Sequence, residues 1–212
     1  TAGHLIGAIN GAFVSYLGVN PFVVTLSVVF VARGLQYFTT LVGLRGTYIM
    51  LPPAMNDLGS KAAFHISSFV VIGVLLYILL EHTKMGRYVH AIGENVQVAR
   101  FSAINVRWYS FLTYVLCGGI AALSGIMLTT YEGMARVGSG DGQLIDAFLL
   151  PLLGGVVFQK MSVEGTTYAA LLISMIINGL FILGASPATV NITKGALLLL
   201  VVLASGIKRL RA

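Results

Sequence analysis

Residues 109–131, YSFLTYVLCGGIAALSGIMLTTY, run without a single charged side chain. At 1.5 Å of rise per residue, a helix of this length is about 34 Å long, which exceeds the roughly 30 Å hydrocarbon core of a bilayer. The stretch therefore predicts a transmembrane helix.

The composition of the whole chain agrees with a membrane protein. Hydrophobic residues make up 57% of the 212 positions and charged residues 9%, and the mean hydropathy is +0.91. About a quarter of the residues of a soluble domain are charged. One cysteine and four histidines leave little material for a metal site. Cys117 lies in the uncharged run and is expected to be a small buried apolar residue.

Seven apolar stretches predict membrane segments when about 20 residues are required for a crossing. One of them is short, and Pro151 with the pair Gly154 and Gly155 makes it broken or re-entrant. The predicted fold class is all-α, a polytopic transmembrane bundle of about six or seven segments forming a single domain over 1–212. The segments are 2–18, 21–41, 63–81, 108–130, 144–158, 165–183 and 188–207.

Basic residues between these segments indicate the orientation of the chain. With the C-terminus in the cytoplasm, the segments 82–107, 159–164 and 208–212 lie inside and hold eight lysines and arginines, against three outside. The positive-inside rule favours this orientation. The net charge of +6 therefore indicates topology and not nucleic acid, because basic clusters with interleaved aromatics are lacking between the apolar runs.

Small residues at four-residue spacing predict close helix packing. Gly3, Gly7 and Gly11 leave one helix face without side chains, and Ala121 and Gly125 repeat the spacing. Such faces let a neighbouring backbone approach closely.

Polar residues inside the apolar stretches are candidates for a translocation path. Arg33 and Gln36 share a helix face and would either line a polar path or bind carbonyls of another helix; both interpretations stay open. Asn10 and Asn178 are expected to hydrogen-bond across helices. Lys194 is close enough to a helix end to extend its amine to the membrane surface.

Carboxylates between the fourth and fifth segments suggest no catalytic site. Asp146 is expected to cap the short fifth segment. Glu132 and Asp141 could join it as an acid/base set, but the glycines of 138–142 predict a flexible external turn between them. The chain contains no G-x-x-x-x-G-K-[ST] motif, so any ATP is expected to bind another subunit.

Residues 84–107, KMGRYVHAIGENVQVARFSAINVR, form a polar interval between two segments. Gly93 is expected to break the chain, with Glu94 and Asn95 opening a short helix. About ten residues would make a rod of roughly 15 Å. The rod would lie either in a groove of a partner or on the lipid headgroups, and the spacing does not choose between them.

The same interval resembles the cytoplasmic loop of ABC-transporter permeases for simple sugars, the ribose, galactose, xylose and arabinose group. The resemblance lies in residues 86–87, 91–93, 95, 99–100 and 102–106. It extends to PFVVTL at 21–26, RGL at 33–35, NGL at 178–180 and the spacing from Asp146 to Gly154. Ala103 stands where this family usually has glycine, which predicts a stiffer end to the loop helix. The chain begins partway along the family pattern, so further N-terminal segments are expected in the complete permease.

The resemblance implies a subunit of an importer in the bacterial inner membrane. Its partners would be cytoplasmic ATPase subunits that bind ATP and Mg²⁺, a second permease subunit, a periplasmic sugar-binding protein and the bilayer. No cofactor would bind this chain, and no nucleic acid would be a partner. The loop 82–107 would hold the coupling helix, from Glu94 to Ala103, which docks on the ATPase. The residues implied in coupling are Gly86, Arg87, Gly93, Glu94, Asn95, Ala99, Arg100 and Ser102.

Two alternatives differ in function. Related permeases for branched-chain amino acids or nucleosides share this architecture, and no pocket residue names the solute. A membrane-embedded hydrolase would need a histidine, serine or carboxylate cluster at one depth. His4, His65, His82 and His90 fall at different levels of the predicted topology, and neither H-E-x-x-H nor G-x-S-x-G occurs in the sequence.

Overall fold

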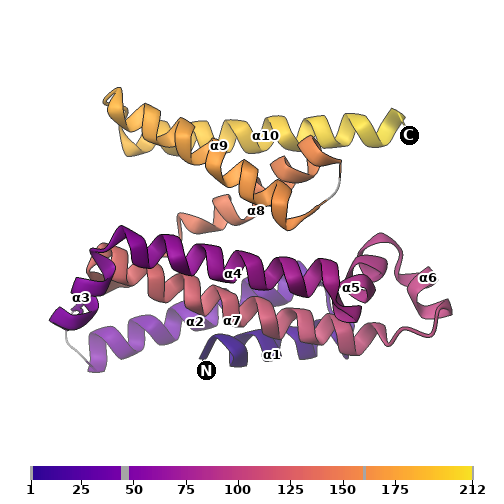
Figure 1. Cartoon of the computed structure of the whole chain (residues 1–212). Coiled ribbons are helices and arrows are strands. Elements are labelled where there is room, and N and C mark those ends of the chain that lie inside the picture. Colours follow the sequence, from indigo (N-terminus) through magenta and orange to yellow (C-terminus); the bar gives the residue numbers. More distant parts are fainter. Residues whose placement is uncertain (1, 44–47, 160, 212) are drawn as a thin grey trace. The chain divides into compact units, whose positions relative to one another are not determined.

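The computed structural model describes residues 2–43, 48–159 and 161–211, and this part of the chain is almost entirely helical (Figure 1). Its elements fall into two compact units, Thr1–Ser139 and Gly140–Ala212. Unit 1 contains α1 (Ala2–Ser15), α2 (Pro21–Phe38), the π-helical turn η1 (Thr39–Gly43), β1 (Tyr48–Met50), α3 (Pro53–Gly59), α4 (Ala62–His82), α5 (Lys84–Glu94), α6 (Val96–Phe101), α7 (Val106–Glu132) and β2 (Met134–Arg136). Unit 2 contains α8 (Gln143–Phe158), α9 (Val163–Ile182) and α10 (Pro187–Arg211).

Each of the seven predicted membrane segments is a helix, and the expected all-α fold class is confirmed. Among the described residues, four helices are long and apolar enough to cross a membrane: Pro21–Val42, Ala62–His82, Val106–Glu132 and Val163–Ile182. Two shorter apolar helices are Gln143–Phe158 and Pro187–Leu203. The predicted interruption of the fifth segment is wrong, because α8 continues through Pro151 and the glycine pair.

Local capping explains where several helices begin. Asn20 Oδ1 accepts a hydrogen bond of 2.9 Å from the Phe22 amide, and Pro21 occupies the first helical position, where its missing N–H costs nothing. The Ser162 hydroxyl accepts the Gly165 amide at the start of α9. α10 begins at Pro187 after the turn that contains Gly184. These helix starts lie within two residues of the segment bounds that the sequence predicts.

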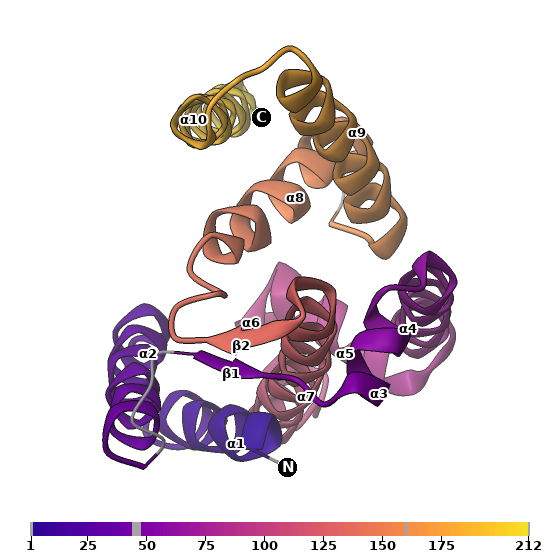
Figure 2. The same cartoon turned by 90° about the vertical axis from the view of Figure 1, so that its left-hand side faces the viewer.

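In unit 1, α1 packs along α7 through the predicted glycine face (Figure 2). A Cβ at Gly7 would collide with the Tyr114 carbonyl oxygen and lie 3.0 Å from the Val115 Cα. Gly3 faces Gly118 of α7 in the same way. Within the described residues, nothing lies within 4 Å of a Cβ placed at Gly125, so its expected packing role stays a prediction.

Two strands that the sequence analysis missed join distant parts of unit 1. β1 pairs antiparallel with β2, with Tyr48 opposite Arg136 and Met50 opposite Met134 (Figure 2). The Ser139 hydroxyl then donates a 2.9 Å hydrogen bond to Glu132 Oε2. The turn after α7 is thus tied to the segment before α3.

Unit 2 has its own small core. Leu149 of α8, Ile173 of α9 and Val201 of α10 are buried and pack with partly buried aliphatic neighbours. Gly154 of α8 approaches Gly165 of α9 so closely that a Cβ would lie 2.5 Å from the Gly165 carbonyl carbon. The glycine that was expected to interrupt α8 therefore brings two helices together.

Candidate functional site

The interval 84–107 contains two helices where one was expected. α5 runs through Gly93 to Glu94, and the chain breaks at Asn95. The predicted break at Gly93 is therefore wrong, because a glycine inside a helix costs only about 1 kcal/mol and the caps decide the boundary. α6 has six residues and is about 9 Å long, shorter than the expected rod.

The start of α5 is fixed against the end of α4. The Thr83 hydroxyl accepts a hydrogen bond of 3.3 Å from the Gly86 amide. Gly86 is buried, and a Cβ there would collide with the Leu80 carbonyl oxygen. Further along α5, the rings of Tyr88 and Tyr109 meet edge to face at 4.9 Å between centroids. The interval thus begins with a tight turn that leaves no room for a side chain at Gly86, whose expected role in coupling stays a prediction.

Asn95 separates the two helices and bonds to both. Its backbone N–H donates a hydrogen bond of 3.1 Å to the Ala91 carbonyl of α5. Its Oδ1 accepts from the Gln97 and Val98 amides of α6 at 2.9 and 3.2 Å. Asn95 thus opens the helix as expected, whereas Glu94, expected to open it as well, is the last residue of α5. One side chain satisfies two amides that would otherwise lack a partner within the helix.

α6 ends in a Schellman motif that has alanine in the left-handed position. The Ala103 amide donates to the Arg100 carbonyl and the Ile104 amide to the Ala99 carbonyl, both at 3.1 Å. Ala103 has φ of 58°, a conformation that glycine adopts without steric cost. This is the position where a glycine was expected from the family pattern.

On α6, apolar side chains are uncovered within unit 1, beside the exposed Gln97 and Arg100. Phe101 is 91% exposed and Val98, three residues before it, is 58% exposed. Ala99 is 2% exposed and faces the unit. The other residues implied in coupling that carry polar or charged side chains lie on the surface; they are Arg87, Glu94, Asn95, Arg100 and Ser102.

The four candidate path residues lie in different environments. Asn10 of α1 has a buried Oδ1 without a hydrogen-bond partner in the described part of the chain. Arg33 of α2 is half-buried and Gln36, one turn later, is exposed. Asn178 is exposed on α9 of unit 2. Their role in translocation stays a prediction.

An ion pair that the sequence analysis missed joins α8 to α10. Lys194 Nζ lies 2.6 Å from Asp146 Oδ2, and the two side chains are 15% and 20% exposed. The expectation that Lys194 reaches the membrane surface is wrong, because a carboxylate nearby is a better partner for a partly buried amine. Asp146 lies in the first turn of α8, as expected, but Gly142 occupies the capping position. Each residue is a charge within an apolar stretch, which indicates that it needs a partner but not which one.

Other candidate chemistry finds little support. Cys117 is exposed on α7 and not buried, because it lies about 100° around the helix from Gly118, which faces α1. Among residues 2–43, 48–159 and 161–211, no three His, Cys, Asp or Glu side chains gather as metal ligands would.

Comparison with known proteins adds independent information. A family model described as "branched-chain amino acid transport system / permease component" matches residues 1–202. The autoinducer 2 import system permease protein LsrD of Yersinia pestis (strain Pestoides F) is 32% identical over 218 aligned positions, which cover 97% of this chain and 64% of the relative. The protein of the same name from Yersinia pseudotuberculosis serotype O:1b is 31% identical, with the same coverage. The chain thus spans about 64% of the length of these relatives. No solved structure matches the chain.

Proposed function

Because the chain belongs to the family of permease components described for branched-chain amino acid transport systems, we propose that it is the membrane-spanning subunit of an ATP-driven importer. In this proposal the chain binds no ATP itself, and cytoplasmic ATPase subunits bind and hydrolyse ATP with Mg²⁺. A second permease subunit and a periplasmic binding protein complete the importer. The helix bundle alternates between two conformations that open its path to opposite sides of the membrane.

The exposed apolar surface of α6 is the observation that carries this proposal. Phe101 and Val98 project beyond the candidate spans from a short helix that caps and a tight turn hold in place. A phenylalanine that is 91% exposed next to a polar surface is typical of a protein contact. Docking of α6 on the ATPase would bury these side chains and let motion of the ATPase reach α5 and α7.

Co-purification with an ATPase subunit tests this docking. The chain and the ATPase of its transport system are co-expressed and isolated through a tag on the chain. We expect Phe101→Asp to abolish association, because the substitution places a carboxylate in the contact. A second pair of variants provides the control. Phe101→Ala is compared with Phe69→Ala, which changes a phenylalanine of the α4 span that is 53% exposed. We expect loss of ATPase association in Phe101→Ala but not in Phe69→Ala.

Two outcomes separate the parts of the proposal. If no ATPase accompanies the unaltered chain, the importer assignment fails. If an ATPase binds the chain and its Phe101→Asp variant equally, the importer assignment holds and docking through α6 is wrong.

The solute proposed is a simple sugar, since the loop and span motifs resemble simple-sugar permeases. The relatives in Yersinia are named for import of autoinducer 2, and that compound is the second candidate. The family description favours a branched-chain amino acid as the third. Uptake into vesicles that contain the complete importer, measured with labelled ribose, autoinducer 2 and leucine in turn, distinguishes the three.

The orientation proposed places the loop 82–107 and the C-terminus in the cytoplasm of a bacterium, with the chain in the inner membrane. The basic residues Arg87, Arg100 and Arg107 are exposed, as expected of an inside loop. A reporter enzyme that is active only in the periplasm, fused after α10, should be inactive. Activity there would reverse the orientation.

A further inference from the structure

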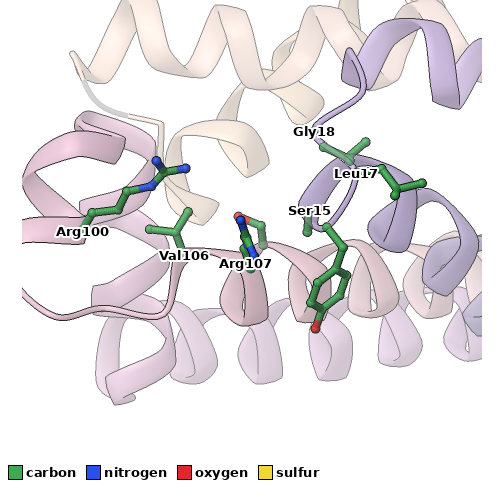
Figure 3. Close-up of a pocket in the computed structure, with 9 residues that line it drawn as sticks. Ser15, Leu17, Gly18, Arg100, Val106 and Arg107 are labelled. Carbon is green, nitrogen blue, oxygen red and sulfur yellow. The ribbon is translucent and has the colours of Figure 1, made fainter.

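A polar pocket of about 320 Å³ lies in unit 1 where α1 ends and α7 begins (Figure 3). Ser15 is the last residue of α1, and Val106 is the first residue of α7. Arg100 of α6 enters from the side, and Figure 3 shows its guanidinium extending toward the region where Arg107 and Ser15 lie. Three helices thus contribute to one pocket.

With α7 across a membrane, the pocket would lie near the membrane surface. α7 is a candidate span whose first residue lines the pocket. Trp108, two residues further along α7, is 49% exposed, and tryptophan concentrates at the level of the headgroups. A lipid phosphate therefore has access to this depth.

The charge of the pocket favours an anion. Arg100 and Arg107 both line it, and each remaining described residue of the lining is neutral. An anion between the two guanidiniums would be attracted by both of them. Guanidinium groups bind phosphate oxygens through paired, charge-assisted hydrogen bonds.

An unsatisfied hydroxyl supports the same conclusion. Ser15 Oγ is buried and has no hydrogen-bond partner among the described residues. A buried hydroxyl without a partner costs about 1–3 kcal/mol, so a ligand oxygen in the pocket would remove this cost. Ser110 lies one turn beyond Val106 on α7 and offers a second hydroxyl.

We propose that this pocket binds the phosphate of an anionic phospholipid and so ties α6 to the adjoining ends of α1 and α7. The exposed apolar side chains of Leu17 and Tyr16 on the lining favour a lipid over a free phosphate ion, because they can contact the glycerol and the upper acyl chain. The site requires only that the helices span a membrane; it does not require an ATPase or a particular solute.

Lipid binding to the full chain tests the proposal. The chain is placed in phosphatidylcholine nanodiscs, titrated with phosphatidylglycerol, and the retained lipid is counted by native mass spectrometry. We expect tight retention of phosphatidylglycerol and a loss of affinity of about tenfold or more in the double variant Arg100→Gln/Arg107→Gln, since both charge-assisted contacts are lost. Arg136→Gln is the matched control, because Arg136 is exposed on β2, which follows the opposite end of α7.

Three outcomes would overturn the proposal. Equal retention by the double variant and the unaltered chain would exclude the pocket. Equal loss in Arg136→Gln would reduce the effect to general surface charge. Binding of inorganic phosphate at millimolar concentration, with no retention of phosphatidylglycerol, would show a site for free phosphate and not for a lipid.

A milder variant keeps the test decisive if the double variant does not fold. Ser15→Ala removes the buried hydroxyl and leaves both arginines in place. We expect phosphatidylglycerol affinity to fall about threefold to tenfold, in line with one lost hydrogen bond, while the thermal midpoint without added phosphatidylglycerol does not fall. Unchanged affinity in Ser15→Ala would contradict the geometry proposed for the phosphate.

Discussion

The α1–α7 contact of unit 1 and the α8–α10 contact of unit 2 are held together by different chemistry. In unit 1, α1 lies against α7 backbone to backbone, and the glycines of α1 leave the carbonyl of Tyr114 directly opposite Gly7. In unit 2, α8 is joined to α10 by the ion pair of Asp146 and Lys194 at 2.6 Å. Lipid chains are as apolar as the helices, so association in a membrane depends on close packing and on polar contacts. The first kind of joint tolerates no added atoms, whereas the second tolerates no lost charge.

The largest effect is expected at the glycine joint. Gly7→Leu adds a branched side chain where even a Cβ collides with the Tyr114 carbonyl oxygen. We expect the free energy of unfolding to fall by about 3 kcal/mol or more, because the backbone cannot move aside as a flexible side chain would. The measurement is the midpoint of thermal unfolding in detergent. Gly125→Ala on α7 is the control, because open space surrounds that position and alanine favours a helix. A small effect of Gly7→Leu would show that α1 and α7 can separate freely.

A smaller loss is expected at the ion pair. Lys194→Met leaves the Asp146 carboxylate without its partner, and breaking a fully buried pair costs about 3–5 kcal/mol. Because the two side chains are 15% and 20% exposed, we expect Lys194→Met to lower the free energy of unfolding by about 2 kcal/mol. The double variant Asp146→Asn/Lys194→Met should recover most of the lost thermal midpoint. If the double variant is as unstable as the single one, the pair does not hold α8 and α10 together.

Helix capping provides a third contrast between the units. Asn95→Ala removes the cap of the short α6, and Ser162→Ala removes that of the much longer α9. Each loss costs about 1 kcal/mol. Hydrogen exchange should rise through the whole of α6 but only in the first turn of α9, whose remaining turns pack against α8. Asn95→Asp, which keeps the accepting oxygen, should exchange as the unaltered chain does; equally slow exchange in Asn95→Ala would contradict the role of the cap.

The smallest effect is expected where two helices end in the same turn with different residues. Ala103 follows the end of α6 with φ of 58°, and Gly184 follows the end of α9 with φ of 80°. Ala103→Gly should stabilise the end of α6 by about 0.5 kcal/mol, because relief of the left-handed conformation exceeds the added entropy of the unfolded chain. Gly184→Ala should destabilise α9 by about 1 kcal/mol. Hydrogen exchange of the two helix ends measures both, and changes of the same sign would refute the comparison.

The sequence predicted the membrane helices well and their partners poorly. In a bilayer, the backbone N–H and C=O groups of a long uncharged run such as 109–131 find their partners within a helix. α7 therefore begins and ends close to its expected bounds. The α1 glycine face was also predictable, because residues four apart share a helix face. The partner of Lys194 was not, since Asp146 lies 48 residues away and no local pattern connects the two.

Loops were predicted less accurately because polar caps compete with helix propensity there. Gly93 was expected to break the chain, yet the single side chain of Asn95 fixes the boundary two residues later. The pairing of β1 with β2 joins residues that are far apart in the chain, which no local pattern predicts. The pocket beside Arg107 depends on three helix ends meeting, and this too needs the fold.

Through the close contact between Gly86 and the Leu80 carbonyl, α5 would rotate together with the end of α4. α5 has 11 residues and is about 16 Å long, so a 10° rotation of α4 would displace Asn95, beyond the far end of α5, by about 3 Å. A bulkier residue at position 86 would change the angle between α4 and α5, and the same rotation would then displace Asn95 in a different direction.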